Sequence, residues 1–141
     1  IDNGSKQEKV GCIGIDTPEL KNDQTGQPDC YAYEAKHELD SRLQGDRVKL
    51  EFDASQGQYD KYQRLLAYVY RASDGLLLNE ELLQIGAARE YTYNKAYRYQ
   101  SVFRQLQSRA KANSTGLWGS CSTGLLSVQL TALLYNMNYE F

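Results

Sequence analysis

The chain has 141 residues, of which 41% are hydrophobic and 24% charged, and its formal net charge at pH 7 is −2. This length and balance are typical of one globular domain that buries its own core. No stretch of about 18 apolar residues occurs, which excludes a membrane-spanning helix, and the polar start at residues 1–6 is unlike a signal peptide.

The charge is divided unevenly along the chain. Residues 1–60 carry 7 Lys or Arg and 13 Asp or Glu, whereas residues 61–111 carry 9 and 4. A basic segment beside an acidic one is compatible with one face for phosphate and another for a cation, or simply with two solvated faces.

The first half of the chain predicts two strands and a helix. Residues 9–15 read as a strand that enters a polar loop over residues 16–29. Asp29 is expected to cap a helix over residues 30–43, and Gly45 to end it. The alternation over residues 46–53 predicts a half-buried strand.

The second half of the chain predicts further short strands and two helices. Residues 73–75 are a hairpin signal, Asn79 is expected to cap a short helix that stops at Gly86, and residues 99–112 form a regular helix. Strands are expected at residues 64–71 and 76–78, and a strand or extended arm at 87–93. Short strands with three helices favour a small α+β barrel.

The three cysteines are Cys12, Cys30 and Cys121, and the one histidine is His37. Their spacing fits no zinc site. The odd count leaves two alternatives, one bridge with a buried thiol or three free thiols.

Five short motifs follow one another in a fixed order. They are GIDTPE at 14–19, DKYQR followed by LAY at 60–68, NEELL with a following glycine at 79–86, the tyrosine-bearing segment 88–93, and GLW at 116–118. Each alone has a simpler explanation, such as a capped turn, a solvated strand start or tyrosines that pack a barrel. Together they resemble the staphylococcal nuclease (thermonuclease) family over residues 8–121.

The resemblance implies a fold and its limits. It implies an α+β, mainly β, OB-fold: a five-stranded barrel with three α-helices over residues 1–121. Residues 122–141 then form an apolar C-terminal extension, expected either to pack on the barrel or to be a sticky tail. By the same resemblance the ends at Cys30 and Cys121 lie close together, which implies a disulfide and a secreted or periplasmic protein. Three reduced thiols in a cytoplasmic protein are the alternative.

The resemblance also implies roles for residues of the first two motifs. Asp16 and the Thr17 carbonyl match ligands of Ca²⁺, a hard cation that accepts both kinds of oxygen. Glu19 matches the residue that orients or deprotonates the attacking water. Arg64 matches a catalytic arginine, whose fork can bond two phosphate oxygens at once.

Four further residues match the family's substrate contacts. Lys61 and Tyr62 match residues at the terminal phosphate and its nucleoside. Tyr91 and Tyr93 match tyrosines of the base pocket, where stacking is indifferent to sequence. Single-stranded DNA or RNA, or a nucleotide, is therefore the implied partner.

The chain departs from the family in two places. A second catalytic arginine of the family falls at Gly11, and loss of such a donor costs on the order of 10²–10³ in rate. The family also begins with a strand that bears a further calcium aspartate, whereas Ile1–Lys9 aligns best with the turn after it. The barrel is therefore expected to lack its first strand, and the metal one ligand.

The retained motif residues and the two departures from the family leave two possible functions. The first is a calcium-dependent nuclease of low sequence specificity, with activity reduced or absent. The second is a degenerate domain that binds nucleic acid or a protein partner without cutting. A purely structural barrel would leave the joint presence of Glu19 and Arg64 unexplained. Oligomeric state cannot be read from the sequence.

Overall fold

The computed structural model describes residues 1–2 and 4–121, which form an α+β fold with two small sheets. The first sheet has the order β1-β4-β3, built from Val10–Cys12, Leu65–Arg71 and Val48–Glu51. Strand β1 is parallel to β4, whereas β3 is antiparallel to it. The second sheet pairs β2 (Ile15–Asp16) with β5 (Arg89–Glu90), antiparallel.

A turn at Gly14 divides the strand that the sequence predicts over residues 9–15. Gly14 has φ +82°, and a Cβ atom there would lie 2.6 Å from the Tyr97 ring and 2.7 Å from that of Phe103. Only glycine combines this backbone conformation with so close an approach. The turn moves Ile15 and Asp16 out of the first sheet and onto β5.

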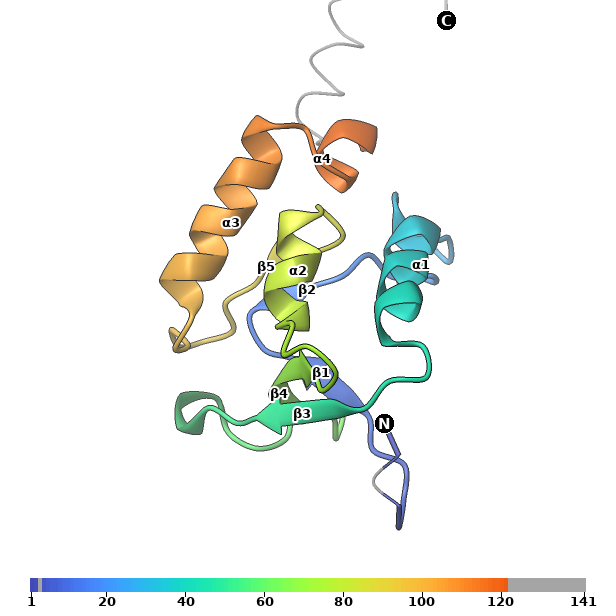
Figure 1. Cartoon of the computed structure of the whole chain (residues 1–141). Helices are drawn as coiled ribbons and strands as arrows, with labels where there is room; N and C mark the ends of the chain where they lie inside the picture. Colours follow the sequence, from blue (N-terminus) through green and yellow to red (C-terminus); the bar gives the residue numbers. More distant parts are fainter. Residues whose placement is uncertain (3, 122–141) are drawn as a thin grey trace, which may run out of the picture.

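The helices lie together beside the first sheet, with α2 between α1 and α3 and with α4 near the far ends of the other helices (Figure 1). Their bounds are Ala32–Leu43 for α1, Leu78–Gln84 for α2, Gln100–Ala112 for α3 and Leu117–Ser120 for α4, with a 3₁₀ turn at Ala54–Gln56. Helix α3 agrees with the expected helix over residues 99–112, whereas α4 was not expected. None of the helices in the described part of the chain has the length and apolar character to cross a membrane.

The predicted helix caps are wrong in two places. Asp29 does not cap α1, because Tyr31 holds that position with φ +71°. Asn79 does not cap α2, which begins at Leu78 after Leu77. Instead Asn79 is fully buried, accepts the Val69 N–H at 2.9 Å and donates to the Ile13 carbonyl at 2.8 Å. The Asn79 side chain therefore links the backbone of β4 to that of residue 13 and does not cap a helix.

Two predicted strands are shorter than expected. At residues 76–78 there is a single bridge, Tyr70↔Leu77, because α2 already begins at Leu78. At 87–93 the strand is confined to Arg89–Glu90, and residues 91–93 have no regular secondary structure. Gly45 has φ +73° directly after the end of α1, as the helix-stop prediction required.

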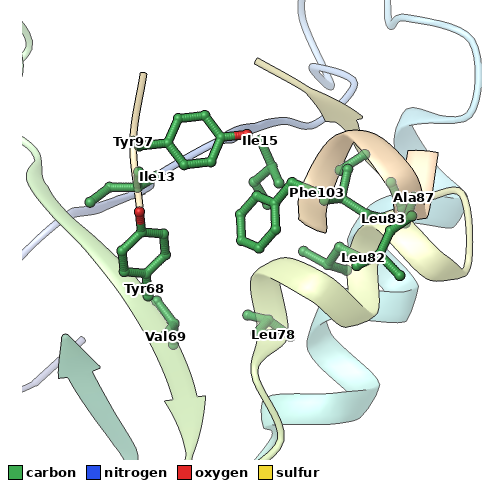
Figure 2. Close-up of a cluster of buried hydrophobic side chains, with 13 residues drawn as sticks. Ile13, Ile15, Tyr68, Val69, Leu78, Leu82, Leu83, Ala87, Tyr97 and Phe103 are labelled. Carbon is green, nitrogen blue, oxygen red and sulfur yellow. The ribbon is translucent and has the colours of Figure 1, made fainter. Parts of the chain in front are cut away.

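The core lies between β4, α2 and α3 (Figure 2). Tyr68 of β4 and Phe103 of α3 are fully buried, with ring centroids 6.1 Å apart in an edge-on arrangement. Leu78, Leu82 and Leu83 of α2 fill the space beside them. The core therefore fixes β4, whose first residue follows Arg64.

This α+β architecture, with four helices in the described residues, is consistent with the OB-like fold implied by the resemblance. The open barrel and the missing first strand stay predictions. The expected role of residues 122–141 lies outside the part of the chain that the structure describes.

Candidate functional site

Asp16 stands at the end of β2, directly opposite Arg89 of β5. Its side chain is exposed, yet protein atoms crowd the carboxylate and raise its pKa, an effect that Arg89 partly opposes, Asp29 adds to and Arg64 again opposes. No hydrogen bond or ion pair to this carboxylate occurs within residues 1–2 and 4–121. Asp16 is therefore an oxygen donor without a protein partner, close to two guanidinium groups.

Glu19 lies three residues further on, in a loop that Asp29 closes. The Asp29 carboxylate accepts the Glu19 N–H at 2.8 Å and the Asn22 side-chain amide at 3.0 Å, while the Asp29 N–H donates to the Glu19 carbonyl at 2.8 Å. The bonds from Glu19 and Asn22 lower the pKa of Asp29. Because these bonds use only the backbone of Glu19, its exposed carboxylate stays available to a ligand.

Arg64 is held by a tight turn that precedes β4. The Asp60 carboxylate accepts Nε of Arg64 at 2.7 Å and the backbone N–H groups of Tyr62 and Arg64, each at 2.9 Å. Although some burial opposes ionisation, these bonds lower the pKa of Asp60. In the described structure neither terminal nitrogen of Arg64 has a hydrogen-bond partner, so the guanidinium is oriented but can still donate.

Aromatic rings beside these charges are open to solvent. Tyr62 is 66% exposed, with Lys61 Nζ at 5.1 Å and Arg64 Cζ at 5.7 Å from its ring centroid. Tyr91 and Tyr93 are 50% and 65% exposed, and the Tyr91 N–H donates to the Gly14 carbonyl at 2.9 Å. Exposed rings beside cations are suited to stacking bases.

Gly11 adjoins Arg64. A Cβ atom at Gly11 would lie 3.5 Å from both Cζ and Nε of Arg64 and 3.3 Å from Cδ2 of Leu66. The guanidinium of Arg64 therefore covers the place where a side chain at position 11 would begin. The nearest neighbours of such a Cβ atom are therefore side-chain atoms, of which Leu66 Cδ2 alone is in tight contact.

The structure brings some of the predicted site residues close together and leaves others apart. Asp16 and Arg64 are near enough to interact electrostatically, and Glu19 joins them through Asp29, whose charge also acts on Asp16. Among the described residues no ring contact links Tyr62 to Tyr91 or Tyr93. The turn that carries Tyr62 and the arm that carries Tyr91 and Tyr93 are thus two separate parts of the candidate site.

The oxygen donors fit a calcium ion in part. The Asp16 carboxylate and the Thr17 carbonyl are the hard ligands that Ca²⁺ accepts, but this ion takes six to eight oxygens. No group of three or more His, Cys, Asp or Glu suited to a metal is found in the part of the chain that the structure covers. Water or substrate oxygens would have to complete the coordination.

Sequence reasoning missed two charged residues of this region, Arg89 and Asp29. Arg89 lies inside the tyrosine-bearing segment 88–93 but was given no role there, and its place opposite Asp16 depends on the β2–β5 register, which the sequence does not reveal. Asp29 was assigned a different role as a helix cap. A carboxylate ten residues after Glu19 was the only signal of the loop closure.

Cys30 and Cys121 form a disulfide with a Cα–Cα distance of 5.9 Å. The bridge ties the segment before α1 to the end of α4. Cys12 is a free thiol in β1, and burial raises its pKa to about 11 against a small opposing effect of Arg64.

The fold is that of a small α+β domain with an exposed cluster of carboxylates, arginines and tyrosines at one edge. A family model described as staphylococcal nuclease homologue matches residues 9–120, and the chain belongs to this family. It is 34% identical over 121 residues to the thermonuclease of Staphylococcus hyicus, which covers 85% of this chain and 68% of that protein. It is 34% identical to the thermonuclease of Staphylococcus intermedius, over 84% of this chain and 67% of the relative.

Another relative is Endonuclease YncB of Bacillus subtilis, 37% identical over 120 residues. The match covers 84% of this chain and 54% of that protein. The chain thus spans about two thirds of the thermonucleases and about half of the endonuclease. At the level of the family, these names support a hydrolase that acts as a nuclease.

Proposed function

We propose that this chain hydrolyses phosphodiester bonds in DNA or RNA with low sequence specificity and in a calcium-dependent manner. The observation that carries the proposal is an unpartnered carboxylate, Asp16, that lies within electrostatic reach of an arginine, Arg64, whose terminal nitrogens are free to bond phosphate. Membership of the family and the nuclease names of its relatives support the reaction class.

Each residue has a role that its surroundings suit. Arg64 donates to two phosphate oxygens and stabilises the charge that develops on them. Glu19 orients the attacking water or removes its proton. Asp16 and the Thr17 carbonyl hold Ca²⁺, which when bound supplies positive charge at the phosphate.

The substrate is a single-stranded nucleic acid or a nucleotide. Lys61 contacts a phosphate, while Tyr62 stacks on the adjoining nucleoside and Tyr91 and Tyr93 line a pocket for a base. Because stacking and phosphate contacts read little sequence, the enzyme would act on many sequences.

Gly11 favours a reduced rate, and with it the alternative of a domain that binds without cutting. The guanidinium absent from this position would cost on the order of 10²–10³ in rate. Since the nearest atoms to a Cβ at Gly11 are ends of side chains, the variant Gly11→Arg is a direct test of this cost.

The disulfide supports a secreted or periplasmic location, because such bridges persist in oxidising compartments. Titration of unfolded, unreduced protein should find one free thiol, that of Cys12. Three free thiols would favour the cytoplasmic alternative.

The function is tested by cleavage of single-stranded DNA and of RNA with calcium and with a chelator. Wild type should cleave only with calcium, Glu19→Gln should lose about 10²-fold or more in kcat, and Arg64→Gln should lose a similar factor. Lys21→Gln, in the same loop as Glu19, is the control and should keep wild-type activity. Binding without cleavage, with activity gained by Gly11→Arg, would instead support the binding domain.

A further inference from the structure

We infer that Arg89 binds a phosphate oxygen of the substrate beside Asp16 and acts as a second phosphate clamp together with Arg64. The inference rests on the proposed function and adds a substrate-binding residue to it. No motif in the sequence singles out this arginine, which stands between two buried alanines and Glu90.

The register of the second sheet determines where the Arg89 side chain lies. Asp16 and Arg89 are directly opposite in the antiparallel pair β2–β5. Opposed residues present their side chains on the same face of a sheet, with Cβ atoms about 4.5–5.5 Å apart. Both residues are exposed, whereas the neighbouring Ile15 is buried, so the shared face of Asp16 and Arg89 is the outer one.

The charge of Arg89 is not neutralised by a protein carboxylate. Its guanidinium makes no ion pair within 4.0 Å of any carboxylate of the described chain, Asp16 included. Most other arginines are paired, as Arg104 is with Glu90 and Arg71 with Asp74. An unpaired cation adjoining an unpartnered carboxylate is the arrangement that a phosphate, with or without a cation, would complete.

Trp118 of α4 holds the guanidinium in place. Arg89 Cζ lies 5.3 Å from the centroid of the Trp118 ring, and Nζ of Lys111 lies 5.1 Å from it. The Arg89 guanidinium makes no hydrogen bond within the described chain, so its N–H groups are free to donate beside this cation–π contact. The tryptophan therefore restrains the side chain without consuming the donors that phosphate needs.

The arrangement also bears on position 11. Because glycine stands there and Arg64 covers it, the first sheet offers one guanidinium to the site. Arg89 of β5 brings a second one from the other sheet, opposite Asp16 in the β2–β5 pair. Two forks from different segments, the turn before β4 and strand β5, can bond different oxygens of one phosphate.

Three variants test the inference in the cleavage assay: Arg89→Gln, Arg89→Lys and, as a matched control, Lys111→Gln, which loses a cation from the same tryptophan ring. Arg89→Gln should lower kcat/KM about 10²-fold, and Arg89→Lys about tenfold, since lysine keeps the charge but not the fork. Lys111→Gln should stay within about twofold of wild type. Thermal unfolding of each variant separates this effect from loss of fold.

Binding provides the second measurement. In the Glu19→Gln background, the affinity for a labelled oligothymidylate is measured against salt concentration. Arg89→Gln should reduce the slope of log K against log salt by about 0.7, the value for one lost phosphate contact to a single strand. Lys111→Gln should leave the slope unchanged.

The outcomes separate this inference from the proposed function. If wild type cleaves DNA but Arg89→Gln matches Lys111→Gln in rate and in salt slope, the role of Arg89 is overturned and the nuclease stands. If wild type does not cleave, the nuclease fails, and the salt slope alone decides whether Arg89 contacts phosphate. A folded Arg89→Lys that is as inactive as Arg89→Gln would still support a fork-specific contact.

Discussion

The core between β4, α2 and α3 and the edge formed by β2, β5 and the loop over residues 16–29 are held together in different ways. In the core, large side chains such as Tyr68, Phe103 and Leu82 have 2% or less of their surface exposed, and Asn79 satisfies two backbone groups inside it. At the edge, each strand has two residues, and backbone pairs together with the Asp29 carboxylate set the geometry.

This difference teaches that stability and chemistry reside in separate regions. The residues proposed to act on substrate are exposed, so their removal exposes little apolar surface and leaves few buried groups unpaired. Substitutions in the core should change the free energy of unfolding more than the rate per folded molecule. Substitutions at the edge should do the reverse.

The largest effect on stability is expected for Leu82→Ala in the core. Leu82 of α2 is 2% exposed, and loss of such a side chain costs about 2–5 kcal/mol of unfolding free energy. Urea denaturation measures this cost, and cleavage assayed well below the melting temperature should stay within a few-fold of wild type. Val102→Ala is the control, because Val102 is 44% exposed on α3 and should change stability by about 0.5 kcal/mol or less. If the cleavage rate fell together with the free energy of unfolding, the proposed separation of a stabilising core from a catalytic edge would be wrong.

A smaller and pH-dependent effect is expected at Asp53, which is 5% exposed. Burial opposes its ionisation, but bonds from the Arg98 N–H, the Ser55 hydroxyl and N–H and the Tyr68 hydroxyl lower its pKa to about 2. Because this pKa lies below the unfolded value near 3.8, ionised Asp53 stabilises the fold above about pH 4, and the gain is lost as pH falls toward 2. The shift corresponds to about 2 kcal/mol.

Urea denaturation between neutral pH and about pH 2.5 checks this prediction. Asp53→Asn should be less stable than wild type at neutral pH, and the two should converge as the pH falls. Asp74→Asn is the matched control, because hydrogen bonds from Arg71 also lower the pKa of Asp74 to about 2, but that carboxylate is exposed. Its effect should be smaller and should diminish with added salt. Equal effects at both positions would contradict the role of burial.

The sequence was sufficient for features that depend on local pattern. The alternation over residues 46–53, the apolar run at 64–71 and the apolar spacing in residues 99–112 predicted β3, β4 and α3. The ordered motifs also indicated the family, which the comparison supports. Where the local pattern and the tertiary contacts agree, the sequence alone is informative.

The failures occurred where a polar side chain has a distant partner. Asparagine is a residue type that often caps helices. The side-chain amide of Asn79 instead forms hydrogen bonds with backbone groups of residues 13 and 69. The division of the first strand at Gly14 depends on the rings of Tyr97 and Phe103, which are more than eighty residues away in the chain. The position of Asp16 opposite Arg89 in the β2–β5 sheet depends on the same turn. None of these contacts leaves a periodic signal.

The smallest effect on stability, but a clear one on rate, is expected for Asp29→Ala at the edge. The variant removes the acceptor of the Glu19 N–H and the Asn22 amide, both in a partly exposed loop, so the free energy of unfolding should change by less than about 1 kcal/mol. The Glu19 carboxylate would then sample more positions, and kcat should fall about tenfold, equivalent to about 1.4 kcal/mol, while KM changes little. Asp23→Ala in the same loop is the control, because no hydrogen bond to its carboxylate is found in the described structure.

The split between kcat and KM distinguishes positioning of Glu19 from general loosening of the loop. A loosened loop would also shift Asp16 and Thr17, which are proposed to hold calcium, so the calcium concentration for half-maximal activity would rise along with KM. Asp29→Asn keeps one acceptor oxygen and should recover part of the lost rate. If Asp29→Ala cleaves as fast as wild type, the backbone hydrogen bond between residues 19 and 29 alone sets the loop geometry, and no side chain is needed to position Glu19.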